Sequence, residues 1–186
     1  MKSLSVRISG FGGQGIILAG LLLGNAAVRK GNVYAVQTQS YGSEARGGEC
    51  QSELIISDEQ INSPTTRYKD ILICLFQSAL DKYLSTLKKT GILIVDPKLV
   101  TEIPPIEANI YQVPATETAI KLGNRIATNM VVLGFLQKFI KMISKEDLRG
   151  VIASMVPKKF ININLKAFDA GVHFAEDLEI TMENIG

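Results

Sequence analysis

A glycine-rich turn between two apolar segments is the feature that most constrains how this chain can fold. The turn reads Gly10-Phe11-Gly12-Gly13-Gln14-Gly15; residues 4–9 before it are typical of a strand, and residues 14–30 of a helix. Glycines let the backbone bend sharply and approach a neighbour closely. The first amides of a helix lack partners within the helix, so its start attracts anions. We therefore expect a strand–turn–helix unit whose turn contacts an anion or another chain.

The glycine spacing leaves three interpretations open. Gly10, Gly12 and Gly15 fit the dinucleotide fingerprint G-x-G-x-x-G, which needs an acidic residue about 20 residues further on to bind the ribose. The next predicted strand, at 32–38, is followed by no carboxylate before Glu44, which argues against a nicotinamide site. The glycines otherwise permit a tight turn and close packing only, or they contact a partner or a cofactor held mainly by another chain.

The order of predicted elements indicates an α/β domain. Further strands are expected at 51–57, 71–76, 92–96 and 110–113, and helices at 78–89, 116–123, 127–143, 145–156 and 158–168. The short connection before the 51–57 strand favours an antiparallel or edge position, because parallel pairing needs a longer crossover. The sequence thus predicts a single domain over 1–186, helical in its C-terminal part. Its predicted fold is a three-layer α/β/α sandwich with a mostly parallel mixed sheet, Rossmann-like in its first half.

Capping-box spacings suggest where two of these helices begin. Ser78 with Asp81, and Ser144 with Asp147, have the three-residue spacing in which each side chain caps the other's backbone. Asp96 closes a buried strand at a place where α/β proteins often carry site residues, although a simple turn is the preferred interpretation.

Two predicted helices are apolar around most of their circumference. These are the helix that follows the glycine turn and the segment Met130–Leu136. Such helices are buried within their own domain or against another subunit. Two of them in a domain of this size favour a large protein–protein interface.

Composition excludes several classes of protein. The chain has 186 residues, 46% of them hydrophobic and 20% charged, with a formal net charge of +2, so nothing indicates nucleic-acid binding. The longest apolar stretch is too short to span a membrane. Cys50 and Cys74 form no C-x-x-C pair, so neither zinc nor an iron–sulfur cluster is expected, and the lone His173 is expected to be structural or solvent-facing. No secretion signal is evident, and we expect a cytoplasmic protein.

A second glycine cluster, Tyr41-Gly42-Ser43-Glu44-Ala45-Arg46-Gly47-Gly48, follows the second predicted strand. The guanidinium of Arg46 suits a carboxylate, a phosphate or a backbone carbonyl. Because the cluster follows a neighbouring strand, we expect it beside the glycine turn, at the same end of the sheet. The alternative is a surface loop with a contact between Glu44 and Arg46.

These two clusters, together with Asn129-Met130-Val131-Val132-Leu133-Gly134, resemble the gamma subunits of 2-oxoacid:ferredoxin (or acceptor) oxidoreductases. The resemblance covers nearly the whole chain, with the last fifteen or so residues left open. Within the family the chain looks most like the 2-oxoglutarate type, with the pyruvate and ketoisovalerate (branched-chain) types next.

The resemblance implies that the chain works only within a complex. Such enzymes decarboxylate a 2-oxoacid on thiamine diphosphate, reduce ferredoxin, flavodoxin or a related acceptor through iron–sulfur clusters, and form an acyl-CoA. It places thiamine diphosphate, Mg and the clusters in alpha and beta subunits, with a ferredoxin-like delta subunit as a further partner. Coenzyme A (CoA) is the co-substrate. This chain would then bind no cofactor tightly and hold no catalytic residue.

The site residues follow from the motifs. We expect Gly12, Gly13, Gln14, Gly15 and Arg46 to contact CoA or a partner subunit; the interface residues expected are Tyr41, Gly42, Glu44, Gly47, Gly48 and Asn129. Gln14 would present its side-chain amide to the partner. Asn129 would bond a partner backbone or cap its own helix. The alternatives to this assignment are a stand-alone nucleotide-binding α/β protein and a non-catalytic scaffold.

Overall fold

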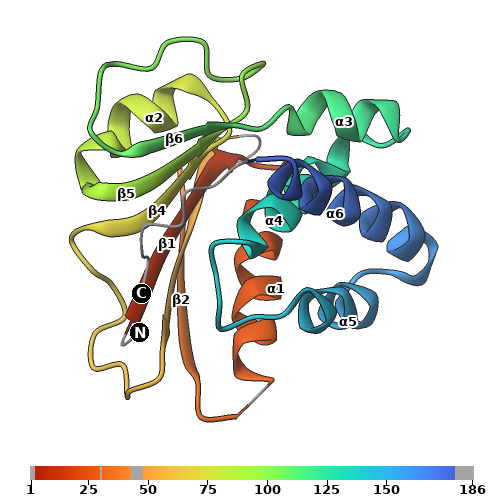
Figure 1. The fold of residues 1–186 in the computed structure, drawn as a ribbon, viewed down its shortest axis with the longest axis horizontal. Helices are drawn as coiled ribbons and strands as arrows, with labels where there is room; N and C mark the ends of the chain where they lie inside the picture. The colour runs from red at the N-terminus through yellow and green to blue at the C-terminus, as the bar shows by residue number, and fades with distance from the viewer. Residues whose placement is uncertain (1–2, 30, 43–47, 179–186) are drawn as a thin grey trace.

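The computed structural model describes residues 3–29, 31–42 and 48–178 of the chain. Six strands form one mixed sheet in the order β2-β3-β1-β4-β5-β6, with helices against both of its faces (Figure 1). The strands are β1 (Ser3–Phe11), β2 (Tyr34–Tyr41), β3 (Glu49–Ser57), β4 (Lys69–Cys74), β5 (Leu87–Val95) and β6 (Asn109–Gln112). The helices are α1 (Ile16–Val28), α2 (Gln77–Tyr83), α3 (Ala115–Lys121), α4 (Thr128–Gln137), α5 (Lys145–Met155) and α6 (Ile161–Glu176).

The sheet is parallel on one side of β1 and antiparallel on the other. β1 pairs in parallel with β4, β4 with β5 and β5 with β6, whereas β3 is antiparallel to both β1 and β2. The predicted α/β fold with a mostly parallel mixed sheet is therefore confirmed. The strand expected at 51–57 is antiparallel as predicted, and it lies inside the sheet because β2 takes the edge.

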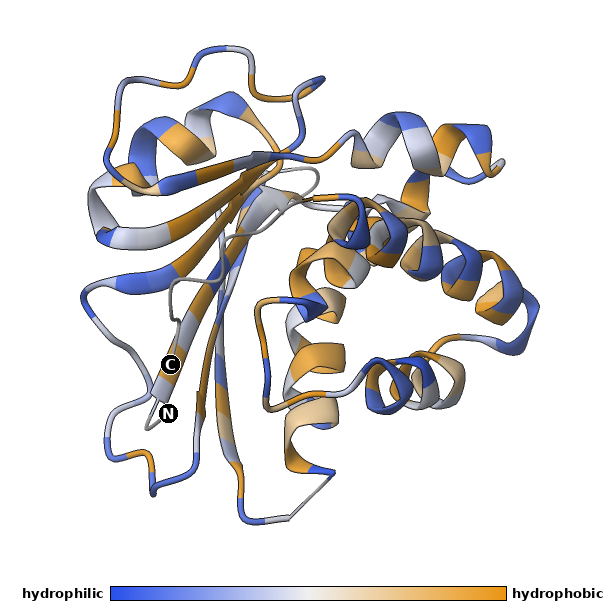
Figure 2. Ribbon diagram, viewed as in Figure 1, coloured by the Kyte–Doolittle hydropathy of each residue, from blue (hydrophilic) through white to orange (hydrophobic). Residues whose placement is uncertain are grey.

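Two apolar cores lie on opposite faces of the sheet. The larger core joins alternate residues of β1, such as Val6 and Ile8, to the inner sides of α1, α4, α5 and α6. The smaller core packs α2 against β4 and β5 through residues such as Leu72 and Leu93. β4 and β5 serve both cores, which explains their continuous apolar sequences (Figure 2).

The apolar character of α4 has its cause inside the domain. Every residue of α4 from Thr128 to Leu136 is buried, mainly against α6. The two helices cross in close contact at Gly134 and Gly171, since a Cβ atom at either position would overlap a carbonyl oxygen of the other helix. Of the two interpretations left open for such helices, burial within the domain holds for α4, so its apolar character gives no support for a subunit interface. α1 is mostly buried too, but it leaves Leu21 and Val28 exposed.

Helix boundaries differ from the predicted ones where a local signal misled. α2 ends at Tyr83 and β5 starts at Leu87, so the helix expected at 78–89 is too long; its Asp81 accepts from the Gln77 side chain (3.0 Å) instead of capping with Ser78. α4 stops at Gln137 rather than at 143, and the last helix runs on to Glu176. The capping box of Ser144 and Asp147 at the start of α5 is confirmed.

A cluster of three charged side chains lies buried on the face of the sheet that α2 partly covers. Lys69 Nζ lies 2.6 Å from Glu53 Oε2, and Arg7 Nε donates to Glu53 Oε1 (3.1 Å). Arg7 also donates to Thr86 Oγ1 (2.8 Å), which ties β1 to the segment after α2. Burial by itself would raise the pKa of Glu53, but the hydrogen bonds from Lys69 and Arg7 outweigh it and hold the pKa below its usual range.

This lowered pKa makes the stability of the domain dependent on pH. A carboxyl whose pKa is lower in the folded chain stabilises it above the unfolded value of 4.5, and this contribution is lost as the pH falls through the folded pKa. We expect Glu53→Gln to lower the free energy of unfolding at pH 7 by about 3 kcal/mol, because two buried cations lose their partner. It should also make the free energy of unfolding fall less steeply at acid pH, which denaturant titrations at several pH values measure. The exposed Glu107→Gln should change neither.

The crossing of α4 and α6 predicts a strong effect for one added methyl group. Gly134→Ala should destabilise the domain by about 3 kcal/mol, because the new Cβ meets the Phe168 backbone, which cannot move aside. Gly150→Ala in α5 is the matched control, since its Cβ meets only the end of the flexible Arg29 side chain. Thermal unfolding should show a drop of about 6 °C or more for the first variant and little change for the second. Equal melting temperatures would contradict the close crossing.

Candidate functional site

The glycine turn closes on itself through the backbone and one side chain. Gln14 N donates to Phe11 O (3.1 Å), and Phe11 N donates to Gln14 Oε1 (2.6 Å). Gly13 and Gly15 have φ values of 94° and 71°, which side chains rarely adopt. The turn thereby directs the chain from β1 into α1, which begins at Ile16.

Two amide side chains fix this turn to the rest of the domain. Gln14 Nε2 donates to Leu75 O (3.4 Å), and Asn129 Nδ2 donates to Gly15 O (3.1 Å). Asn129 is 3% exposed, and a Cβ at position 15 would overlap its amide nitrogen. Asn129 thus neither caps α4 nor lies at the surface of this chain; it crosses to the start of α1. The Gln14 amide, expected to face a partner, is bonded within the chain at both its oxygen and its nitrogen.

The second glycine cluster lies beside the turn, as far as the structure describes it. Gly12 N donates to Gly48 O (2.9 Å), and Gly42 N donates to Glu49 O (2.6 Å) across the β2–β3 pair. Tyr41, the last residue of β2, is 64% exposed. The predicted contact residues Glu44, Arg46 and Gly47 lie outside the described residues. The two predicted clusters therefore meet at one end of the sheet through Gly12 and Gly48.

Side chains around this junction brace it against α2. Phe11 stacks on Phe76 with ring centroids 4.0 Å apart, and Glu49 pairs with Lys82 at 2.9 Å. The hydrogen bond from Lys82 is the main reason that the pKa of Glu49 is lowered. Cys50, next along β3, is buried, which raises the pKa of its thiol.

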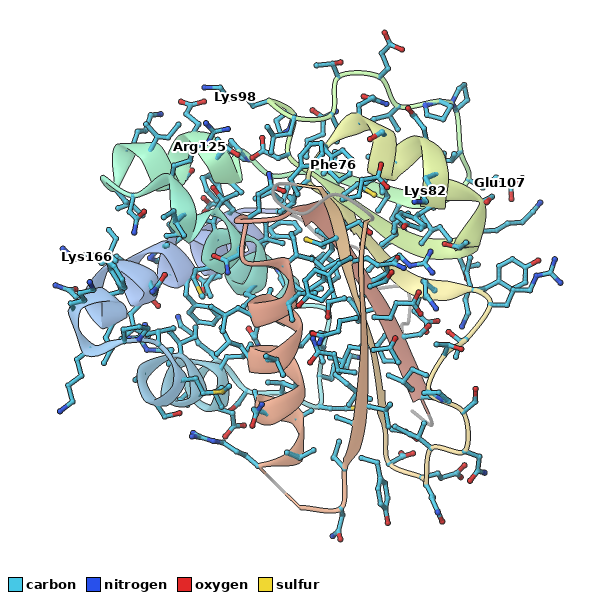
Figure 3. The ribbon with its side chains drawn as sticks, turned by 180° about the vertical axis from the view of Figure 1, so that it is seen from behind. Phe76, Lys82, Lys98, Glu107, Arg125 and Lys166 are labelled. Atoms are coloured by element: carbon cyan, nitrogen blue, oxygen red, sulfur yellow. The ribbon has the colours of Figure 1, made fainter. Side chains whose placement is uncertain are left out.

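A pocket of about 270 Å³ opens beside the turn. It is lined by residues of the turn and of the segments around α3 and α4: Phe11, Gly13, Gln14, Thr116, Arg125, Ile126 and Thr128. Arg125 and Phe76 lie at this end of the sheet (Figure 3). Arg125 is the functional candidate that sequence reasoning missed, because 110 residues separate it from Gly15. One feature of the sequence could have indicated it: Arg125 lies between two predicted helices that follow the last parallel strand.

Polar contacts fix the rim of this pocket. Asn124 Oδ1 accepts from Ile126 N (3.1 Å), and Thr128 Oγ1 donates to Arg125 O (2.7 Å). The fully buried Asp96 accepts from Thr116 N (2.6 Å) and from Lys98 N (2.9 Å). Asp96 therefore stabilises a turn and the start of α3, in agreement with the prediction that it belongs to a simple turn.

The pocket is suited to an anion. The first backbone amides of α1 have no acceptor within the helix, and the positive end of the helix dipole lies at the same place. Within the described ranges, the exposed guanidinium of Arg125 has no carboxylate partner. Phe11 and Ile126 supply apolar surface, with Ile126 68% exposed. The combination fits a ligand that carries both phosphate and an apolar or aromatic group.

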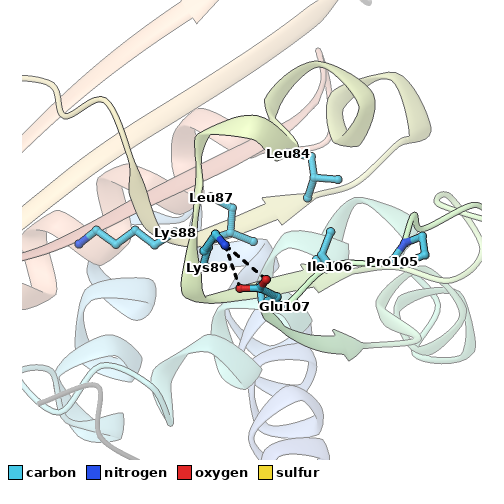
Figure 4. A pocket seen from close by; sticks show the side chains of 8 residues that line it. Leu84, Leu87, Lys88, Lys89, Pro105, Ile106 and Glu107 are labelled. Atoms are coloured by element: carbon cyan, nitrogen blue, oxygen red, sulfur yellow. Dashed lines mark hydrogen bonds and ion pairs between the residues drawn. The ribbon is translucent and has the colours of Figure 1, made fainter.

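A second pocket, of about 250 Å³, lies where β5 and β6 begin, away from the glycine turn. Leu84, Leu87, Pro105 and Ile106 line it, together with Lys89 and Glu107, which form an ion pair at 3.2 Å (Figure 4). Its lysines are already paired, Lys88 with Asp70 and Lys89 with Glu107.

The described residues form neither a metal cluster nor a membrane-spanning helix. No group of three or more His, Cys, Asp or Glu side chains is placed to hold a metal ion in that part of the chain. None of the helices found there combines the length and the apolar character needed to cross a membrane.

The contact between Asn129 and the glycine turn yields a stability prediction. Asn129→Ala should cost about 1 kcal/mol, the contribution of one hydrogen bond. Asn129→Asp should cost more, because a carboxylate oxygen would then face the carbonyl of Gly15. Chemical denaturation measures both, with the exposed Asn162→Ala as control. An Asp variant as stable as the wild type would contradict the assigned contact.

Comparisons with known proteins agree on one family. A family model described as pyruvate ferredoxin/flavodoxin oxidoreductase matches residues 5–174. The chain is 47% identical to the 2-oxoglutarate synthase subunit KorC of Methanocaldococcus jannaschii, over 93% of this chain and 94% of that one. It is 44% identical to KorC of Methanothermobacter thermautotrophicus, over 89% and 92% of the two chains.

Solved structures give the same result. The keto/oxoacid ferredoxin oxidoreductase gamma subunit of Geobacter sulfurreducens matches with a TM-score of 0.83 and 41% identity, over 94% of this chain and 99% of that one. The 2-oxoglutarate:ferredoxin oxidoreductase of Magnetococcus marinus, solved with 2-oxoglutarate, coenzyme A and succinyl-CoA, matches with a TM-score of 0.87 and 26% identity. That match covers 96% of this chain and 32% of the longer one. The predicted resemblance is confirmed: the chain belongs to the pyruvate ferredoxin/flavodoxin oxidoreductase family, as a subunit of the gamma type.

Proposed function

We propose that this chain is the gamma subunit of a complex that oxidises 2-oxoglutarate to succinyl-CoA. The identities carry the choice of substrate: relatives named 2-oxoglutarate synthase subunits reach 47%, whereas ketoisovalerate and indolepyruvate oxidoreductase subunits reach 32% and 30%. The similarity to the 2-oxoglutarate synthase subunit also spans nearly the full length of both chains. Pyruvate and branched-chain oxoacids are the alternative substrates within the family.

The chemistry of the pocket supports a division of labour between subunits. Its polar groups are backbone amides, a guanidinium and threonine hydroxyls, which bind and orient a ligand but do not exchange protons near neutral pH. We infer that alpha and beta subunits hold thiamine diphosphate, Mg and iron–sulfur clusters, with a ferredoxin-like delta subunit as a further partner. Thiamine diphosphate, when bound there, supplies the electron sink for decarboxylation. Ferredoxin or flavodoxin accepts the electrons.

The pocket beside the glycine turn is the proposed contact with CoA, and it is the observation that carries this role. Arg125 and the backbone of Gly13 and Gln14, just before the start of α1, suit a phosphate, and Phe11 and Ile126 suit an adenine ring or an apolar stem. A volume of about 270 Å³ takes one end of CoA, since sites that enclose a whole small ligand are about 300 Å³ or larger. The remainder of CoA would extend towards the partner subunits.

The other predicted site residues divide into two groups. Gln14 and Asn129 are positioning residues in this proposal, because both bond to the backbone of this chain. Tyr41, Gly42, Glu44, Gly47 and Gly48 stay predictions for a subunit interface, and Arg46 stays a second candidate for the phosphates of CoA.

Cys50 and Cys74 are free thiols, which supports a reducing compartment and hence the cytoplasm.

Reconstitution tests the function as a whole. Co-expression of this chain with alpha and beta subunits encoded in its native host should yield a complex that reduces ferredoxin with 2-oxoglutarate and CoA. Its kcat/KM for 2-oxoglutarate should exceed those for pyruvate, 2-ketoisovalerate and indolepyruvate. A stand-alone nucleotide-binding protein would instead be indicated if the purified chain bound NAD(H) or FAD tightly.

Within that complex, Arg125 separates CoA binding from assembly. Arg125→Ala should raise the KM for CoA at least tenfold and leave the KM for 2-oxoglutarate unchanged, because it removes a charged hydrogen bond to phosphate. Lys121→Ala removes a nearby positive charge that is already paired with Glu117 and should have little effect. Arg46→Ala is the decisive comparison. If it alone raised the KM for CoA, the phosphate site would belong to Arg46; if neither variant did, the pocket would have no role in CoA binding.

A further inference from the structure

The edge strand β2 lacks the devices that normally keep sheet edges from pairing. β2 pairs with β3 over all eight residues, without a bulge, and among the described residues it is the last strand on its side of the sheet. Its sequence, Tyr-Ala-Val-Gln-Thr-Gln-Ser-Tyr, contains no proline and no charge. A long, regular and uncharged edge is a template for another strand.

The helix beside this edge is equally uncharged. α1 contains no Asp, Glu, Lys or Arg, although these types make up 20% of the chain. Leu21, Asn25 and Val28 form an exposed stripe on α1, and between them and β2 lies a groove of about 210 Å³. Ala35 and Gln37 of β2 form its other wall.

We propose that β2 pairs antiparallel with β2 of a second copy of this chain, across a two-fold axis at Thr38. Two six-stranded sheets would then join into one of twelve strands. In this register Thr38 faces Thr38 of the second copy, Gln37 faces Gln39, and Ala35 faces Tyr41. The proposal assigns the interface of Tyr41 to a second gamma copy, and it holds independently of the substrate and of CoA.

The register of the β2–β2 pairing follows from the position of the groove between α1 and β2. Odd-numbered residues of β2 lie on the α1 face, as the bond from Gln37 Nε2 to Ile17 O (3.2 Å) shows. Tyr41 is therefore on that face too, and pairing about Thr38 brings the exposed Tyr41 ring of one copy opposite Ala35, on the wall of the other copy's groove. The groove of each copy, whose walls carry Leu21, Val28 and Ala35, would then receive the aromatic ring of the other copy.

Charge and hydrogen-bonding chemistry favour a second copy over a different protein as the occupant. In this register every side chain of the edge meets another residue of the same uncharged strand, so no two like charges are brought together. Gln, Thr and Ser each carry a donor and an acceptor, so each can pair with its own kind.

Sedimentation equilibrium of the purified chain tests the proposal. The wild type should be a dimer. Tyr41→Ala should weaken the dimer at least tenfold, and Gln39→Lys combined with Ser40→Lys should abolish it, because two charges then enter the paired edge. Both of these positions are exposed in the single chain. The matched control is Asn109→Lys with Gln112→Lys, two exposed positions on β6 at the opposite edge, which should stay dimeric.

Cross-linking tests the register. Thr38→Cys should form an intermolecular disulfide under mild oxidation, because paired strands bring facing Cα atoms within about 5.5 Å. Asn109→Cys should not, and the native Cys50 and Cys74 are buried. A monomeric wild type, or a dimer that the β2 lysines leave intact, would overturn the proposal. A dimer without the Thr38→Cys cross-link would overturn this register. Capture of the β2 edge by an alpha or beta subunit in the complex, with no self-pairing, would also overturn it.

Discussion

The contact between the start of α1 and the buried amide of Asn129 is the constraint on which the site depends. Its donation to the carbonyl of Gly15 anchors the glycine turn to α4, and Gln14 anchors the same turn to the strand end at Leu75. Gly13 and Gln14, which precede the start of α1, are thereby held beside Arg125 in the lining of one pocket. A site held by backbone and buried side chains suits binding of an anion in fixed orientation.

The close packing of α4 supports this arrangement from behind. Gly134 and Gly171 let α4 and α6 cross at backbone contact, and the resulting layer keeps Asn129 buried. On the opposite face of the sheet, the Arg7–Glu53–Lys69 cluster ties β1 to β3 and β4. The strand that leads into the turn is therefore held from both sides.

Much of the fold was readable from the sequence, because it depends on local patterns. Apolar runs and turn residues located the six strands, and the short 39–49 connection predicted the antiparallel β3. The missed features depend on contacts between distant residues. Nothing local revealed that α4 is apolar because α6 covers it, that Asn129 reaches Gly15, or that Arg125 lies beside a turn 110 positions earlier. The end of α2 was missed because the lysines that begin β5 also suit a helix.

The central claim is that the start of α1 and the segment around Arg125 form one CoA-binding corner of the complex. Hydrogen–deuterium exchange of the assembled complex, with and without CoA, tests it most directly. The account predicts slower exchange with CoA in peptides covering 11–18 and 122–128, and unchanged exchange in β5 and β6. Protection confined to other subunits, or to parts of this chain remote from the turn, would contradict it.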